Sequence, residues 1–317
     1  MLQTVFVGIA AGLAAALLFL APASGTVLAF PLFALTGLPI AIAGLAWGFR
    51  AAAVAAIAGS VVIAAMLSSA LTALVFVLLF GAPAVWLSRL VGLSRATDAS
   101  DPAGPREWFP LSRLLLHASG AIAVAVVIAG LVVGYQPEAM VREATSAVTD
   151  WLSATPSGGP SPTADQIEPL MRVYVAVLPF MLGALMVAIT VFGLWLASLV
   201  ARASGRLARP RERLWTIVLR NEILIGFAVA LALAFLPGAL GDIAGVVAGA
   251  FGCALALVGL AVVHALTLGM SGRAPLLVIC YSLVILSGLP LLPLAALGAG
   301  ESFLQLRARR FGRAPPP

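Results

Sequence analysis

Long apolar stretches alternate with short polar segments along the whole chain. A helix of about 20 apolar residues crosses a hydrocarbon core of about 30 Å. Because a helix satisfies its own backbone hydrogen bonds, we predict helices rather than strands, in spite of the many valines. Nine segments meet this criterion: 3–21, 27–48, 51–67, 70–91, 113–135, 171–200, 221–237, 243–268 and 275–298.

The first apolar stretch has some features of a secretory signal. Ala21-Pro22-Ala23 resembles a cleavage site for removal of such a segment. However, no Lys or Arg precedes the apolar run, and that run, from Val5 to Leu20, is longer than the usual signal core. We therefore expect a retained first helix.

Composition supports a membrane protein. Hydrophobic residues make up 62% of the chain and charged residues only 9%, whereas soluble domains carry about 25% charged residues. The mean hydropathy is +1.13. One water-soluble core cannot hide this much apolar surface, so lipid must cover part of it. The expected fold is all-α: a single membrane domain, 1–317, forming a polytopic transmembrane helical bundle of eight to nine spans.

The arginines indicate the orientation of the spans, since cytoplasmic loops retain basic residues. The segments 89–113 and 201–220 are rich in Arg, whereas acidic residues outnumber arginines in the segment 136–170. We therefore expect the first two as cytoplasmic loops and the third as an extracytoplasmic loop. This places the N-terminus in the cytoplasm and the protein in the inner membrane of a bacterium.

The basic tail, 300–317, conflicts with that scheme. Nine crossings would leave it outside, yet it contains Arg307, Arg309, Arg310 and Arg313. Pro290 and Pro293 interrupt the last apolar segment, which is therefore either a full crossing or a re-entrant hairpin. Its roughly 24 residues are too few for two full crossings. The side of the C-terminus stays open at this point.

The extracytoplasmic loop contains a predicted amphipathic helix, 138–152, which Pro137 can open at its first turn. Its apolar residues recur at helical spacing on one face: Val141, Ala144, Val148, Trp151 and Leu152. Such a helix either lies on the membrane surface or covers the outer mouth of the bundle. The following segment, 153–163, has the composition of a flexible linker.

Polar residues gather at the expected outer ends of the spans. One interpretation is ordinary interfacial polarity; the other is a shallow, outward-facing ligand pocket. The candidate ligand-binding residues are Ser24, Thr26, Tyr135, Gln136, Arg172, Tyr174 and Asp242. The two cysteines, Cys253 and Cys280, belong to no Cys/His cluster, so we expect no metal site and no cofactor.

Small residues recur every four positions on the first helix, at Gly8, Gly12 and Ala16. This spacing lets a second helix approach backbone to backbone. The second helix is either another part of this chain or a partner protein.

Two sequence features that could indicate catalysis, a serine motif and a pair of histidines, do not support an enzyme. Gly269-Met270-Ser271-Gly272 resembles the nucleophile motif of rhomboid proteases, but no histidine follows Ser271, and the only candidate base, His264, precedes it. We expect His117 and His264 to be neutral rings bonded to a carbonyl or a hydroxyl group. The arginines are not interleaved with aromatic residues on a soluble face, so we expect no nucleic-acid binding.

Four stretches, in order along nearly the whole chain, resemble the DUF2232 (YybS-like) family of bacterial membrane proteins. They are Phe30-Pro31-Leu32 to Trp47-Gly48, the acidic helix 138–152, Pro210-Arg211-Glu212 with Leu214-Trp215, and Leu297-Gly298 through Leu306-Arg307 and Arg309-Arg310. The chain departs from the family pattern in using only Arg as its basic residue and in having Ala-rich spans.

The resemblance implies a distant similarity to the substrate-binding S-components of energy-coupling-factor transporters. Those proteins capture a small molecule from outside and dock on coupling subunits through small residues of the first helix, a face that Gly8, Gly12 and Ala16 would supply here. The expected function is therefore that of a membrane protein that binds a small solute or lipid-like ligand with partner subunits. The alternative is a non-transport scaffold or assembly factor for other membrane proteins.

Overall fold

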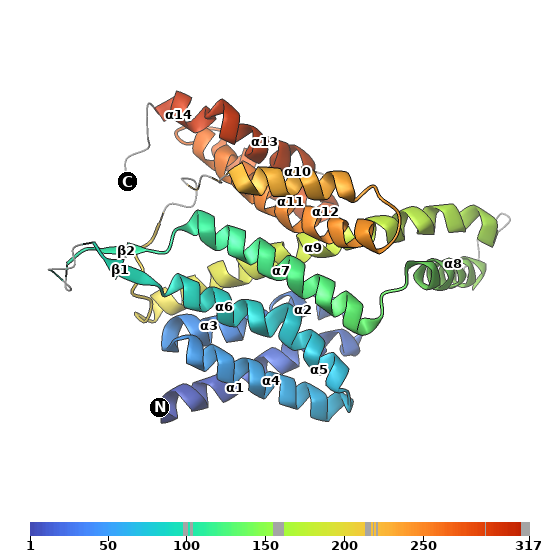
Figure 1. Ribbon diagram of the computed structural model, residues 1–317, viewed down its shortest axis with the longest axis horizontal. Helices are drawn as coiled ribbons and strands as arrows, with labels where there is room; N and C mark the ends of the chain where they lie inside the picture. The colour runs from blue at the N-terminus through green and yellow to red at the C-terminus, as the bar shows by residue number, and fades with distance from the viewer. Residues whose placement is uncertain are drawn as a thin grey trace.

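The computed structural model describes the chain except for residues 98–100, 102–103, 155–161, 213–216, 218, 220, 289 and 312–317, and the side chains of 221 and 285. Helices dominate this described part (Figure 1). Among the described residues, seven helical segments are long and apolar enough to cross a membrane, and three shorter apolar helices accompany them. The all-α fold and a membrane protein with several apolar helices are therefore what the structure supports.

The first half of the chain forms a bundle of antiparallel and parallel helices. Its elements are α1 (Leu2–Leu20), a 3-10 turn (Ala21–Ser24), α2 (Ala29–Ala34), α3 (Gly37–Trp47), α4 (Phe49–Leu67), α5 (Ala70–Phe76), a π-helical segment (Val77–Gly81), α6 (Ala82–Val91) and α7 (Leu111–Val133). Between α6 and α7, the strands β1 (Ser94–Ala96) and β2 (Arg106–Trp108) form an antiparallel hairpin.

The second half begins with α8 (Pro137–Ala154) and α9 (Ala164–Ala203). It continues with α10 (Asn221–Leu233), α11 (Ala239–Leu266), α12 (Arg273–Ser287), α13 (Leu291–Leu304) and α14 (Leu306–Phe311). A capping box starts α9, because the Gln166 side chain accepts a hydrogen bond from the Thr163 backbone at 3.1 Å. At 40 residues, α9 is about 60 Å long, roughly twice the thickness of a hydrocarbon core.

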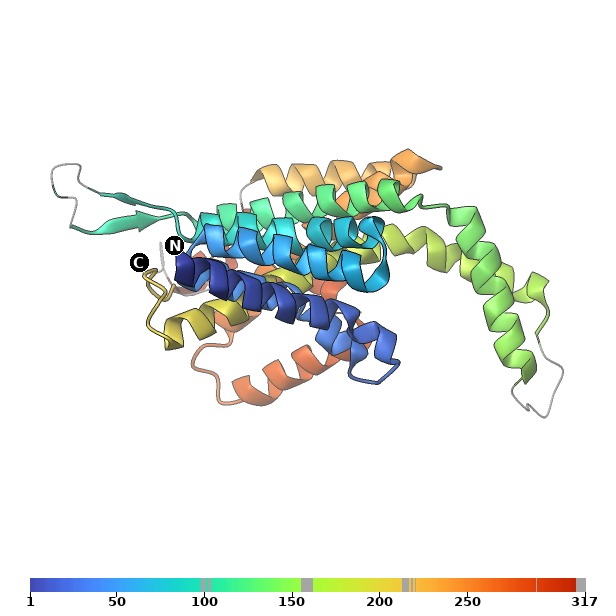
Figure 2. The same ribbon diagram turned by 90° about the horizontal axis from the view of Figure 1, so that it is seen from below.

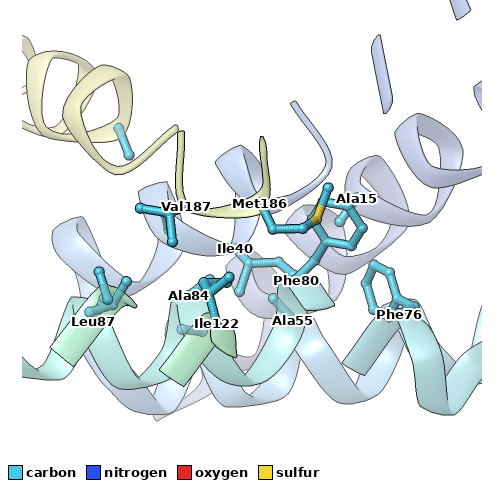
Figure 3. Close-up of a cluster of buried hydrophobic side chains, with 14 of the residues drawn as sticks. Ala15, Ile40, Ala55, Phe76, Phe80, Ala84, Leu87, Ile122, Met186 and Val187 are labelled. Atoms are coloured by element: carbon cyan, nitrogen blue, oxygen red, sulfur yellow. The ribbon is translucent and has the colours of Figure 1, made fainter. Parts of the chain in front are cut away.

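The core of the first half lies where α1, α3, α4 and α6 meet α7 and α9. Figure 3 shows Ile40, Phe76, Phe80, Leu87 and Val187 among its side chains. Phe76 and Phe80 both pack against Phe19 with near-perpendicular rings, an arrangement that aromatic quadrupoles favour. Alanines and glycines occupy most of the remaining buried positions, so the helices of this core approach closely.

Helix α11 is the centre of the second half and contacts α7, α9, α10 and α13. Glycines allow these approaches. A Cβ atom at Gly249 would lie 1.9 Å from the carbonyl oxygen of Phe180 in α9, and one at Gly259 would lie 1.8 Å from that of Leu294 in α13. Only glycine leaves room for such backbone contacts, so these helices are fixed by small residues rather than by interlocking large ones.

The connections between helices lie at two opposite ends of the bundle. Met1, the β1–β2 hairpin and α14 lie at one end, here called the Met1 end, and α8 lies at the other, the α8 end (Figures 1 and 2). Hydrogen bonds support this grouping at the Met1 end: the Arg209 guanidinium donates to the carbonyl of Phe109 at 2.8 Å, and Arg310 donates to that of Leu268 at 3.1 Å.

Most predicted segments correspond to observed helices, with three differences. The segment 221–237 contains the shorter helix α10, which ends at Leu233. The segment 275–298 is two helices, α12 and α13, separated at Gly288 and Pro290, and α13 extends to Leu304. The sequence left a full crossing and a hairpin open for this segment, and its path as two helices corresponds to the hairpin. The pattern of apolar and polar residues also did not predict the β1–β2 hairpin within the segment 89–113.

The predicted helix 138–152 is α8, which begins at Pro137 as expected. It packs against the first part of α9 and runs steeply across the direction of the bundle helices (Figure 2). Val141 is buried, whereas Trp151 of the same apolar face is 66% exposed. The two helices form a projecting pair at the α8 end (Figure 2).

Candidate functional site

A groove opens on the side of the bundle between α6 and α7. Its origin lies in Pro83, which has no N–H to bond the carbonyl of Leu79 and whose ring would clash with that carbonyl in a regular helix. The helix widens just before this proline into the π-helical segment Val77–Gly81, where the N–H of Ala82 donates to the carbonyl of Val77. Single π-helical turns of this kind are frequent at functional sites.

The groove has a volume of about 560 Å³ and is lined almost wholly by apolar side chains. One wall comes from Leu78 to Trp86 and the other from Leu116 to Ile128 of α7. A Cβ atom at Gly120, in the floor, would meet no atom within 4 Å. Along α7 the groove extends about 18 Å, roughly half of a hydrocarbon core and thus about one leaflet.

The polar groups of the groove lie at the end nearer to Met1. The ring of His117 packs against Trp86 and Phe109, with centroids 6.0 and 5.7 Å away. Arg113 precedes His117 by one helical turn on the same face of α7, and both side chains are exposed. The groove is therefore apolar over most of its length, with an imidazole at one end and the basic Arg113 one turn beyond its lining.

The predicted outer residues fall into two groups. Ser24 and Thr26 lie just after α1, where their hydroxyl oxygens are 3.1 Å apart. The others, Tyr135, Gln136, Arg172, Tyr174 and Asp242, lie on or beside α7, α9 and α11. Among the described residues no hydrogen bond or ion pair joins the two groups, and no residue of either group lines the α6–α7 groove.

Within the second group, the side chains of Tyr135 and Arg172 bind other parts of the protein. The Tyr135 hydroxyl donates to the carbonyl of Val175 at 3.4 Å. Burial of the ring, together with the negative charge of Asp242, raises the pKa of Tyr135 above its ordinary value. Arg172 pairs with Glu138 at 3.2 Å and with Glu168 at 2.8 Å, and so links α9 to the start of α8. Gln136 and Tyr174 are exposed.

The small-residue face of α1 is covered by α4. A Cβ atom at Gly8 would lie 2.9 Å from the carbonyl oxygen of Ala51, and one at Gly12 would lie 2.8 Å from the nitrogen of Gly59. Ala16 is fully buried. These three residues thus pack inside the chain, and the face expected to dock a partner helix is not exposed in this structure.

The arginine-rich segment after α9 has a partly structural role. Arg209 is 5% exposed; its guanidinium pairs with Glu212 at 2.6 Å and donates to the carbonyls of Val91 and Phe109. It thereby fastens the base of the β1–β2 hairpin to the end of α9. Arg209 differs in this from Arg206 and Arg211 of the same segment, which are both exposed. The motif residues Leu214 and Trp215 lie outside the described residues.

The groups considered for catalysis do not form a catalytic pair. The Nε2 atom of His264 lies 2.9 Å from the hydroxyl oxygen of Tyr281, the kind of hydroxyl partner expected for a neutral ring. Ser271 lies in the exposed turn between α11 and α12. The described residues contain no group of three or more His, Cys, Asp or Glu side chains able to hold a metal ion.

Comparison with known proteins gives no relative for this chain: no family model, no curated protein and no solved structure matches it. Sequence reasoning did not identify the α6–α7 groove. Two signals for it exist in the sequence, namely Pro83 inside an apolar span and the small pair Gly120-Ala121 on the facing helix. Both are common in membrane helices, so neither could have singled out the site.

Proposed function

We propose that this chain is a multi-pass membrane protein in which the seven long apolar helical segments and the apolar segment that contains α10 cross the bilayer, with the Met1 end in the cytoplasm. The arginine distribution supports this orientation. Among the described residues, Arg142 and Arg172 lie in the α8–α9 pair at the α8 end, while the other arginines lie in connections or helix ends at the Met1 end. The α12–α13 hairpin, whose two helices are too short for full crossings, returns the basic tail to that end, so the arginines that contradicted nine crossings agree with eight crossings and a re-entrant hairpin.

We further propose that the protein binds a lipid-like small molecule in the α6–α7 groove, as a substrate-binding subunit of the S-component kind would. The observation that carries this proposal is the groove itself: an apolar groove about one leaflet long, with His117 in its lining at one end and Arg113 one helical turn beyond it on α7. Such a site matches an amphipathic molecule with its apolar part among the helices and its polar head at the cytoplasmic surface. It requires no catalytic residue and no cofactor.

The test is to fill the groove without disturbing the fold. Gly120→Leu places a side chain into open space, and Gly226→Leu does the same on α10, away from the groove. The proteins are purified in mild detergent, and the small molecules that they retain are identified by mass spectrometry. We expect the wild type and Gly226→Leu to retain the same apolar molecule and Gly120→Leu to lose most of it. Equal retention by all three proteins would reject the groove as the site.

A second candidate function, a scaffold for other membrane proteins, is favoured by the projecting α8–α9 pair and the β1–β2 hairpin, which extend from opposite ends of the bundle (Figure 2). A photo-crosslinking residue in place of the exposed Trp151 should then capture a protein from native membranes. Recovery of transporter coupling subunits would support the substrate-binding role, whereas recovery of other membrane machinery, lost on neutralising Arg206 and Arg211, would support the scaffold.

A further inference from the structure

The corner between α3 and α4 is an open, tight turn at the Met1 end. Helix α3 ends at Trp47, and α4 begins at Phe49. Gly48 between them has φ +91°, a conformation that side chains disfavour, and a Cβ atom there would meet nothing within 4 Å. The chain therefore reverses direction in one residue, and the first N–H groups of α4 lie at an uncovered surface.

Three arginines surround this corner. Arg50 is the second residue of α4. Arg89, from the last turn of α6, places its guanidinium carbon 5.3 Å from the ring centroid of Phe49. Arg206, which follows α9, places its guanidinium carbon 4.5 Å from the ring of Trp47. The rings orient these two cations by cation–π attraction but leave their positive charge uncompensated.

Three other arginines at the same end are each paired with a carboxylate. Arg95 pairs with Glu107 at 2.6 Å, Arg209 with Glu212 at 2.6 Å, and Arg307 with Glu301 at 2.8 Å. Within the described part of the chain, Arg50, Arg89 and Arg206 make no ion pair and are all exposed. The positive end of the α4 dipole adds to their charge. This corner is thus a concentrated cationic site without an acid of its own.

We propose that the phosphate group of an anionic phospholipid binds at this corner, held by Arg50, Arg89 and Arg206. Guanidinium groups match phosphate oxygens geometrically, and basic sites at the cytoplasmic ends of helices recognise anionic headgroups. The surface beside the corner identifies the anion as part of a lipid. Phe49, Ile57 and Val61 form an exposed apolar strip that begins at the corner and continues along α4, with Ile57 64% exposed. An acyl chain attached to the bound phosphate would lie on this strip.

This inference rests on the proposed orientation of the chain but not on the α6–α7 groove. The test uses the purified full-length protein in detergent micelles that contain either phosphatidylglycerol or phosphatidylcholine. The variants are Arg89→Gln/Arg206→Gln and the matched control Arg95→Gln, an exposed arginine at the same end that already has a carboxylate partner. Native mass spectrometry counts the bound lipid, and thermal unfolding reports its stabilising effect.

We expect phosphatidylglycerol to stabilise the wild type more than phosphatidylcholine does. Removal of two surface charges corresponds to about thirtyfold weaker binding of the anionic lipid. The double variant should therefore lose most of the extra stabilisation by phosphatidylglycerol, while Arg95→Gln retains it. The doubly substituted Arg89→Lys/Arg206→Lys protein, which keeps both charges, should retain a large part of it. An equal melting temperature of all variants in phosphatidylcholine establishes that each variant is folded. If the double variant melts at a lower temperature there, the number of lipids bound to its folded fraction is compared with the wild type instead.

Two outcomes would overturn the proposal. In one, Arg95→Gln loses as much lipid as the double variant, which means that the effect follows net charge and not this corner. In the other, inorganic phosphate alone stabilises the wild type as much as phosphatidylglycerol does, which identifies a free-anion site. The Gly120→Leu variant separates the two proposals, because it should keep the full response to phosphatidylglycerol even where the groove ligand is lost.

Discussion

Helices α11 and α12 follow each other in the chain, and both are apolar, yet their surroundings differ completely. More than half of α11 is buried, with neighbours on several sides. In α12, by contrast, none of the side chains that the structure describes is buried, and Leu286 is 83% exposed. Hydropathy is thus a guide to residence in the membrane but not to packing within it, because lipid is as apolar as a neighbouring helix.

The sequence difference that matches this contrast is the supply of small residues. Helix α11 contains Gly245, Gly249, Gly252 and Gly259, which lie against neighbouring helices. Helix α12 contains no glycine, and its large apolar residues point outward, as in Val278 and Ile279. Because the hydrophobic effect of water is absent within a bilayer, close backbone approach is the main source of helix association. Helix α12 lacks the glycines that would allow such an approach to a neighbouring helix.

The largest effect on stability is expected at the buried ion pair between Glu301 of α13 and Arg307 of α14, two helices that pack against α11. Glu301 at the end of α13 accepts hydrogen bonds from the side chain of Arg307 at 2.8 Å and from the backbone of Leu306 at 2.9 Å, and both members of the ion pair are buried. Glu301→Ala leaves the buried Arg307 without its carboxylate, which costs about 3–5 kcal/mol. Thermal unfolding in detergent measures the loss.

The matched control is Glu107→Ala, which breaks the exposed pair with Arg95 and should cost less than about 1 kcal/mol. If the two alanine variants melt at the same temperature, the buried pair does not hold α13 and α14 against α11.

A smaller effect is expected at the glycine contacts themselves. Gly249→Ala brings a methyl group against the backbone of Phe180, and the forced separation of α9 from α11 should cost about 2–3 kcal/mol. Gly226→Ala on α10 adds the same methyl group in open space and should cost nothing. The comparison of their melting temperatures isolates the steric cost, and a tolerated Gly249→Ala would mean that α11 does not depend on close approach.

The same contrast explains what the sequence could and could not predict. Apolar length located most spans, because the hydrocarbon thickness imposes one requirement on every crossing. It merged α12 with α13, since the break at Gly288 and Pro290 interrupts an otherwise continuous apolar run. The positive-inside rule had already indicated the error, because the arginines of the tail were inconsistent with an odd number of crossings.

The sites were harder to predict than the spans. Gly8 and Gly12 were correctly identified as a helix-packing face, but spacing alone cannot distinguish α4 of the same chain from a partner protein. The pairing of Arg206 with Trp47 and of Arg89 with Phe49 joins segments far apart in sequence, which local patterns do not encode. Tyr135 and Arg172, predicted as ligand-binding residues, lie near the α8 end, where their polar atoms bind other parts of the protein.

The smallest expected effect concerns the attachment of α12. The hydrogen bond between His264 of α11 and Tyr281 is a polar link between α12 and the bundle, and a bond of this kind contributes about 1 kcal/mol. Tyr281→Phe should therefore leave the melting temperature almost unchanged but let α12 move away from α11 about fivefold more often.

The half-buried thiol of Cys280 reports this motion through its rate of maleimide labelling, with the buried Cys253 as an internal reference that stays unlabelled. Ser282→Ala, an exposed change on the same helix, should label at the wild-type rate. An unchanged labelling rate in Tyr281→Phe would mean that α12 is held in place by its ends alone. Helices α11 and α12 would then differ in the area of their contacts but not in their mobility.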